Sequence, residues 1–184
     1  MELKELMNKA NDVYLDNFPN ETRFERSVFF SWGCTINDCG FCYMSAQPKD
    51  KEVKETRRSL GSVFAEVLLI KHLGWDLGFF TGGIGVYSPD EMEFLLKTIY
   101  EVLGEKVWLN IGALPRSLLM RFKPYLKGIV GSTETIEPGL HNKICPSKPL
   151  DVYEKMFNFA KELDIPRAMT FIVGMGEDES HLKY

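Results

Sequence analysis

Three cysteines lie within a nine-residue segment that follows an apolar run. Cys34, Cys39 and Cys42 are separated by short, polar and glycine-containing spacers. Thiolates are soft ligands that favour iron–sulfur clusters, zinc and copper(I). Because no fourth cysteine lies close by, one coordination position stays open to a ligand from outside the protein. The segment is therefore predicted to hold a reactive metal centre.

Other uses of these thiols have to be weighed against a cluster. A structural zinc ion normally takes four ligands, and His141 and Cys145, far along the chain, could complete such a set. Free cysteines are also buried simply as small apolar side chains. A disulfide is less favoured, because the N-terminus lacks the apolar core of a signal peptide. The cysteines therefore indicate metal binding and leave the metal open.

Composition bounds the function classes. The chain has 184 residues, of which 45% are hydrophobic, and this suits one globular domain with a substantial core. The net charge of −4 argues against a nucleic-acid-binding surface. The apolar stretch 63–80 is interrupted by Glu66, Lys71 and Asp76, so no membrane span is predicted. We expect a cytoplasmic protein.

Strand and helix patterns alternate five times along the chain. Strands are predicted at 28–32, 77–80, 107–111, 129–133 and 167–173. Helices are predicted at 2–16, packed on the outside or base of the domain, and at 59–73, 89–103, 115–123 and 152–163. The helix at 89–103 is the best defined, with Ser88 as N-cap, Glu91 completing a capping box and Gly104 beyond its end.

This alternation predicts an α/β fold with parallel strands joined by right-handed helical crossovers. Functional residues should then collect at the C-terminal ends of the strands. About five βα units cannot close an eight-stranded barrel, so an open, parallel partial (β/α) barrel is expected. We expect residues 1–184 to form a single domain. The start of another predicted helix at 178–182 suggests that this domain is incomplete at its C-terminus.

The cysteine segment resembles the cluster-binding loop of radical S-adenosylmethionine (SAM) enzymes. That loop usually reads Cys-x3-Cys-x2-Cys with an aromatic residue before the last cysteine, and Phe41 occupies the aromatic position here. The spacing departs by one residue, because four residues separate Cys34 from Cys39. The resemblance implies a partial barrel in which Cys34, Cys39 and Cys42 bind three irons of a [4Fe–4S] cluster. The fourth iron would take the amino and carboxylate groups of SAM.

A glycine-rich segment after the second predicted strand extends this resemblance. Thr81, Gly82 and Gly83 look like the family segment that holds the SAM amino group, although Ile84 stands where that motif often has Glu. Without the family, the segment would be an ordinary tight turn.

Glu134 and the segment 134–146 resemble the biotin synthase-like subgroup, which includes the hydrogenase-maturation enzymes. In that subgroup the acid matching Glu134 helps to hold SAM. Lys155 roughly matches an arginine that pairs with the SAM carboxylate, but lysine lacks the planar fork of arginine. Asn110 is a further candidate polar residue of the site. A solvated acid, a surface lysine and a turn-forming asparagine are the alternatives.

The segment 170–177 resembles the adenine-binding pattern Gly-x-Ile-x-Gly-x-x-Glu of the family, with Thr170 at the first glycine. The resemblance implies that Ile172 contacts adenine, whereas without the family Ile172 would be a core residue.

The function implied by this resemblance is reductive cleavage of SAM. An electron from a donor such as ferredoxin or flavodoxin would cleave SAM to methionine and a 5′-deoxyadenosyl radical. That radical would abstract hydrogen from a small-molecule substrate, in cofactor or metallocluster biosynthesis. Sulfur insertion is poorly supported, because Cys145 is the only spare cysteine. A non-catalytic iron–sulfur or zinc protein and SAM-dependent methylation are the alternatives.

Overall fold

The computed structural model describes residues 2–47 and 52–176, and its centre is one five-stranded sheet. Neighbouring strands are parallel, and their order in space follows their order in the chain. The strands are β1 (Glu25–Phe29), β2 (Asp76–Thr81), β3 (Val107–Asn110), β4 (Leu126–Glu134) and β5 (Arg167–Phe171). The predicted parallel α/β architecture is confirmed, and all five C-terminal strand ends meet at one edge of the sheet.

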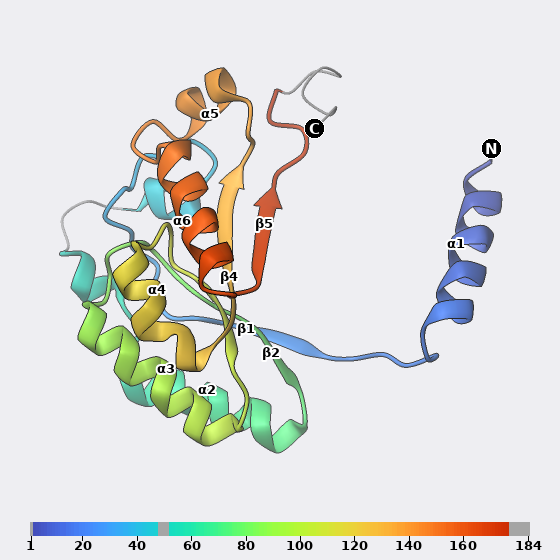
Figure 1. Ribbon diagram of the computed structural model, residues 1–184, viewed down its shortest axis with the longest axis horizontal. Helices are drawn as coiled ribbons and strands as arrows, with labels where there is room; N and C mark the ends of the chain where they lie inside the picture. Colours follow the sequence, from blue (N-terminus) through green and yellow to red (C-terminus); the bar gives the residue numbers. More distant parts are fainter. Residues whose placement is uncertain (1, 48–51, 177–184) are drawn as a thin grey trace.

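Six α-helices accompany the sheet in the described residues. They are α1 (Leu3–Asn17), α2 (Leu60–Leu73), α3 (Pro89–Leu103), α4 (Arg116–Phe122), α5 (Pro138–Ile144) and α6 (Leu150–Glu162). Figure 1 shows α2, α3, α4 and α6 along one face of the sheet, while α1 stands apart on the other side. No helix among the described residues is long and apolar enough to cross a membrane. The predicted helix start at 178–182 lies outside the described residues.

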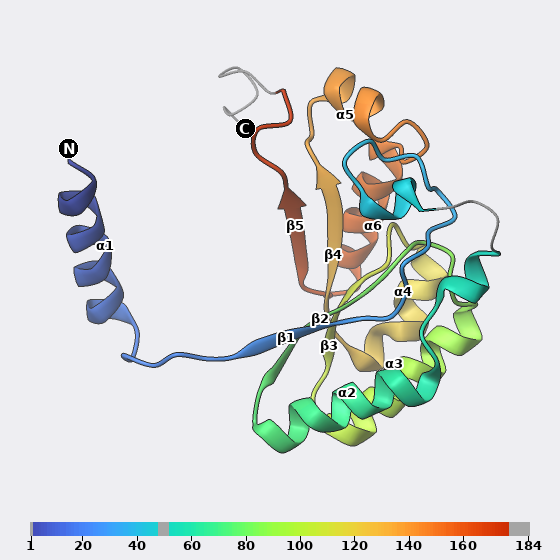
Figure 2. The same cartoon turned by 180° about the vertical axis from the view of Figure 1, so that it is seen from behind.

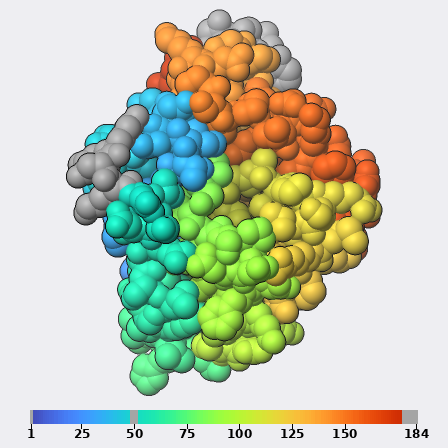
Figure 3. Space-filling model, turned by 90° about the vertical axis from the view of Figure 1, so that its left-hand side faces the viewer, coloured from blue at the N-terminus to red at the C-terminus, as the bar shows by residue number. Residues whose placement is uncertain are grey.

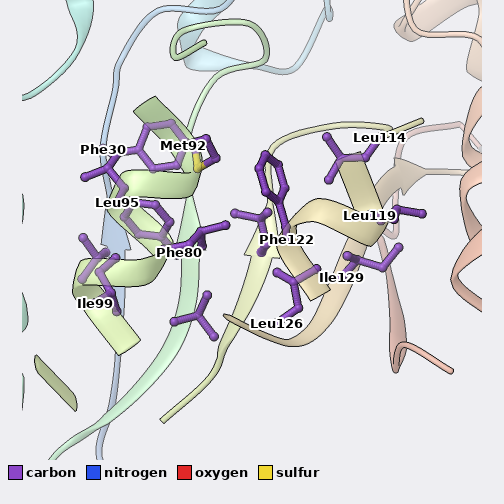
Figure 4. Packing of buried hydrophobic residues seen from close by; sticks show 14 of the residues in the cluster. Phe30, Phe80, Met92, Leu95, Ile99, Leu114, Leu119, Phe122, Leu126 and Ile129 are labelled. Carbon is purple, nitrogen blue, oxygen red and sulfur yellow. The ribbon is translucent and has the colours of Figure 1, made fainter. Parts of the chain in front are cut away.

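The helix-covered face of the sheet holds the core. Val28, Phe30 and Phe80 are fully buried on this face, and the rings of Phe30 and Phe80 lie 4.8 Å apart. Figure 4 shows Phe30 and Phe80 against Met92, Leu95 and Ile99 of α3, beside a second group of side chains that includes residues of α4 and β4. Because side chains alternate along a strand, Phe29 and Phe79 lie on the opposite face, where both are partly exposed.

Some element boundaries differ from the predictions. β1 begins at Glu25 and not at residue 28, because Glu25 and Arg26 pair with Asp76 and Leu77 of β2. β4 begins at Leu126, which pairs with Val107 of β3. Apolar runs reveal the buried part of a strand but not the polar residues that backbone pairing adds to it.

Helix α5 is not among the predicted helices, because the prolines at 138, 146 and 149 are typical of a loop. Pro138 occupies the first turn, where a missing backbone N–H costs nothing. The Glu137 side chain accepts hydrogen bonds from the backbone N–H groups of Gly139 and Leu140 and so caps the helix. The segment that follows β4 is therefore ordered helix and not irregular loop.

The predicted helix 2–16 exists as α1, but its expected packing against the domain is not found. None of its residues is buried, and Leu3 and Met7 are 71% and 64% exposed. Figure 2 shows the extended segment that leads from α1 into β1. The helical periodicity of the sequence therefore identified the element correctly but not its surroundings.

We expect Leu95→Ala to lower the free energy of unfolding and Leu3→Ala to leave it almost unchanged. Leu95 is fully buried, so its truncation should lower the free energy of unfolding by about 2–5 kcal/mol. Leu3→Ala should change it by less than about 0.5 kcal/mol, because Leu3 is exposed. Urea unfolding followed by circular dichroism measures both, and a similar loss for the two variants would contradict this division.

Candidate metal centre

A cavity of about 160 Å³ opens at the C-terminal ends of the strands, and most of the predicted site residues line it. Phe41 and the three cysteines come from the loop after β1, and Glu134 comes from the end of β4. Thr81, Gly82, Gly83, Asn110, Ser132, Lys148 and Tyr153 also line the cavity. The structure thus brings together in space segments that are separated by more than a hundred residues of sequence.

Two neighbouring segments hold the cysteine loop in place. Thr35 donates from both its backbone N–H and its hydroxyl to the carbonyl oxygen of Ile84, each at 2.9 Å. The Gly40 N–H donates to the carbonyl oxygen of Ile144 at 2.8 Å. In Figure 3 the loop, in blue, lies against the orange segments of α5 and α6. Hydrogen bonds therefore attach one end of the cysteine loop to the turn that follows β2 and the other end to the C-terminus of α5.

The extra residue between Cys34 and Cys39 is accommodated by a left-handed turn. Asn37, which lies between them, has a φ of 51°. Asparagine adopts this conformation more readily than most residues. The variant spacing therefore has a local conformational solution, and all three thiols still line one cavity.

The glycine-rich segment packs directly against the cysteine loop. A Cβ at Gly83 would lie 1.7 Å from the carbonyl oxygen of Gly33, and a Cβ at Gly82 would lie 2.3 Å from the Phe30 ring. The Gly83 N–H donates to the hydroxyl of buried Ser31 at 2.8 Å. Close backbone approach within the protein is thus one physical reason for these glycines, in addition to the ligand contact that the sequence suggested.

Glu134 is buried at the end of β4 and forms an ion pair with Lys148. The Lys148 Nζ lies 2.8 Å from the Glu134 Oε1, and the two side chains are 7% and 8% exposed. The Lys148 ammonium also lies 5.3 Å from the centre of the Tyr153 ring. Burying two charges is costly unless the ion pair has good geometry and further hydrogen bonds. The buried pair therefore places one positive and one negative charge at the wall of this cavity.

His141 links the end of β4 to the segment that carries Lys148. Its buried ring lies with Nδ1 2.9 Å from the Thr133 carbonyl oxygen and Nε2 2.6 Å from the Lys148 carbonyl oxygen. Both ring nitrogens are therefore engaged by the backbone, and His141 does not join Cys145 as a ligand pair. Among the described residues, no three His, Cys, Asp or Glu side chains converge on a point that would hold a single metal ion.

Cys145 is fully buried, directly after Ile144, whose carbonyl oxygen accepts the Gly40 N–H of the cysteine loop. Burial is the main cause that raises the pKa of Cys39 to about 12, and Cys145 adds to this effect. Burial also raises the pKa of Cys145. Because iron and zinc bind the thiolate, metal binding at Cys39 has to release this proton.

Two predicted site residues do not line the cavity. Lys155 is 65% exposed and pairs with Asp151 at 2.8 Å on the outer face of α6, whereas Tyr153 and Met156 of the same helix are buried. Ile172 is 40% exposed, and only its backbone N–H reaches the site, by donating to the Glu134 carbonyl oxygen at 2.9 Å.

Lys148, Ser132 and Tyr153 line the cavity but were not predicted. Lys148 lies between two prolines outside any periodic segment, so the sequence gives no pattern that reveals its burial. The Ser132 hydroxyl hydrogen-bonds Asn110 and Thr170 at 3.0 Å each. Its position near the end of β4, two residues before Glu134, was the available signal, although an irregularity between the two residues interrupts the alternation of the strand.

We expect Gly83→Ala to disturb the cysteine loop and Gly61→Ala to leave it intact. The new methyl group would collide with the Gly33 backbone, which should cost about 1–3 kcal/mol of stability and lower iron uptake. A Cβ at Gly61 of α2 meets no atom within 4 Å, so this variant should be neutral or gain up to about 1 kcal/mol. Thermal unfolding and iron analysis after reconstitution test both, and normal values for Gly83→Ala would refute the packing argument.

The comparisons with known proteins agree with this geometry. The family model described as "Radical SAM superfamily" matches residues 28–183. An uncharacterized protein of Methanocaldococcus jannaschii, MJ0597, is 35% identical over 184 residues, which cover 99% of this chain and 50% of that protein. The crystal structure of methylornithine synthase (PylB) matches with a TM-score of 0.81 and 22% identity, over 99% of this chain and 55% of that one.

These matches have two consequences. The chain spans about half the length of the relatives it matches. The likeness to methylornithine synthase confirms the predicted fold class. The five parallel strands correspond to the partial barrel of a radical SAM enzyme. Because the family model matches most of its length, this chain belongs to the radical SAM superfamily.

Proposed function

We propose that this protein is a radical SAM enzyme that acts on a small-molecule substrate. One observation carries the proposal: the three cysteine thiols, the glycine-rich segment and Glu134 line a single cavity at the C-terminal ends of parallel strands. This is the position at which barrel enzymes of this architecture assemble their active sites.

The thiols fit a [4Fe–4S] cluster better than a single ion. A structural zinc needs its ligands about 2.3 Å from one centre, and no such group of three exists among the described residues. A cluster needs one thiolate for each of three irons, so separate thiols around one cavity suit it. In this proposal Cys34, Cys39 and Cys42 are those ligands. When bound, the reduced cluster supplies the electron that cleaves SAM and starts hydrogen abstraction.

The remaining cavity residues offer the contacts that SAM requires. Thr81, Gly82 and Gly83 line the cavity, and backbone carbonyl groups at the two glycines would suit an ammonium group. Asn110 and Glu134 supply acceptors for ribose hydroxyls, and Asn110 also supplies donors. Phe41 contributes an apolar wall.

The carboxylate of SAM requires a basic partner, and Lys148 is the basic side chain that lines the cavity. We assign it this role in place of Lys155, which pairs with Asp151 in solvent. Ile172 is proposed for adenine only through its place directly after β5, because its side chain is outside the cavity lining.

A role in cofactor or metallocluster biosynthesis is proposed for the reaction. It is supported by the resemblance of Glu134 and the segment after it to the biotin synthase-like subgroup. The electron donor is proposed to be a ferredoxin or a flavodoxin. A reducing cytoplasm suits the four cysteines, which are all free thiols.

We expect Cys39→Ala to lose the cluster and Cys145→Ala to keep it. Removing a thiolate ligand should abolish most four-iron incorporation, whereas Cys145 does not line the cavity. Anaerobic reconstitution followed by iron, sulfide and zinc analysis measures the outcome, and methionine release from SAM under dithionite measures turnover.

Two results would contradict the proposal. One zinc ion per chain without iron or sulfide would favour a structural zinc protein. An intact cluster in the wild type that neither binds nor cleaves SAM would favour a non-catalytic iron–sulfur protein.

A further inference from the structure

A lysine buried beside three candidate cluster ligands requires an explanation. The Lys148 side chain is 7% exposed and lines the same cavity as Cys34, Cys39 and Cys42. Removing an ammonium group from water is expensive, and proteins rarely accept that cost without a compensating charge. Glu134 compensates part of it, at 2.8 Å from the Lys148 Nζ.

The position of Lys148 is fixed from the backbone outward. Its N–H donates to the Cys145 carbonyl oxygen at 3.1 Å, and its own carbonyl oxygen lies 2.6 Å from the His141 Nε2. The ammonium group is held between Glu134 and the face of the Tyr153 ring. The charge therefore has a defined place and does not sample solvent in the way that an exposed lysine does.

Both members of the ion pair lie at the wall of the cavity that the three thiols line. Because the two side chains are almost completely buried, water screens their charges only weakly. Each charge therefore acts on a group that the thiols hold, the ammonium group in one direction and the carboxylate in the other.

We propose that Lys148 is a positioning residue that raises the reduction potential of the cluster bound by Cys34, Cys39 and Cys42, with Glu134 as the counter-charge that limits this effect. The inference rests on the proposed function. Reduction adds an electron to an anionic thiolate-bound cluster, so a fixed positive charge nearby stabilises the reduced form. Net charge around a cluster is one of the factors that set its potential, and burial weakens the screening of that charge by water.

A charge series tests the sign of this effect. The variants are Lys148→Met, Glu134→Gln and the double variant, in which neither charge remains and no buried partner is left unpaired. Midpoint potentials are measured by anaerobic redox titration with electron paramagnetic resonance detection, in the absence of SAM. Lys148→Met should shift the potential to more negative values and Glu134→Gln to more positive values. The double variant should lie between these two.

Lys155→Met is the matched control. It removes the same charge from a lysine that is 65% exposed and paired with Asp151 at the same 2.8 Å distance, so the potential should stay at the wild-type value. If Lys148→Met does not fold or hold a cluster, Glu134→Gln and the double variant can still be compared. These two differ only at residue 148, so the difference between their potentials gives the sign of the Lys148 effect.

The outcomes separate this inference from the proposed function. Equal potentials in all variants, with a cluster that still cleaves SAM in the wild type, would overturn the role of Lys148 alone. A wild-type protein that holds no iron–sulfur cluster would overturn the proposed function and this inference with it.

Discussion

The contact between the backbone of the β2 turn and the backbone of the cysteine loop determines the geometry of the whole site. Gly33 and Gly83 approach so closely that no side chain fits between them, and Thr35 doubly hydrogen-bonds Ile84. The thiols are thereby placed against the end of the sheet and not left on a free loop. The position of any bound cluster relative to the strand ends follows from this contact.

A second anchor comes from the opposite side of the cavity. The short helix α5 brings Ile144 to Gly40, the buried Cys145 follows Ile144 directly, and the turn after it places Lys148 over the cavity. The buried ring of His141 connects this turn to the end of β4. The parallel sheet supports the site from below, and these two anchors hold the cysteine loop between segments from both halves of the chain.

Site residues were easiest to predict from the sequence where a chemically suitable side chain lies at the end of a predicted strand. Cysteine spacing, the glycine-rich turn and the acid at the end of β4 were recognisable because side-chain type and strand position agreed. Lys148 escaped prediction because its burial depends on tertiary contacts of a proline-flanked turn. Lys155 was proposed because it roughly matches an arginine of the family. A helix rotates by about 100° per residue, so Lys155, two positions after the buried Tyr153, lies on the solvent side of α6.

Helix α1 differs from the other long helices in what maintains it. The others are stabilised by burial on the sheet, whereas none of the fifteen residues of α1 is buried. A helix of this length without tertiary contacts is marginal in water, since nucleation is unfavourable and each added residue gains little. Its helix content therefore depends on local propensity and temperature, and melting of α1 would be a gradual, non-cooperative process uncoupled from the unfolding of the sheet.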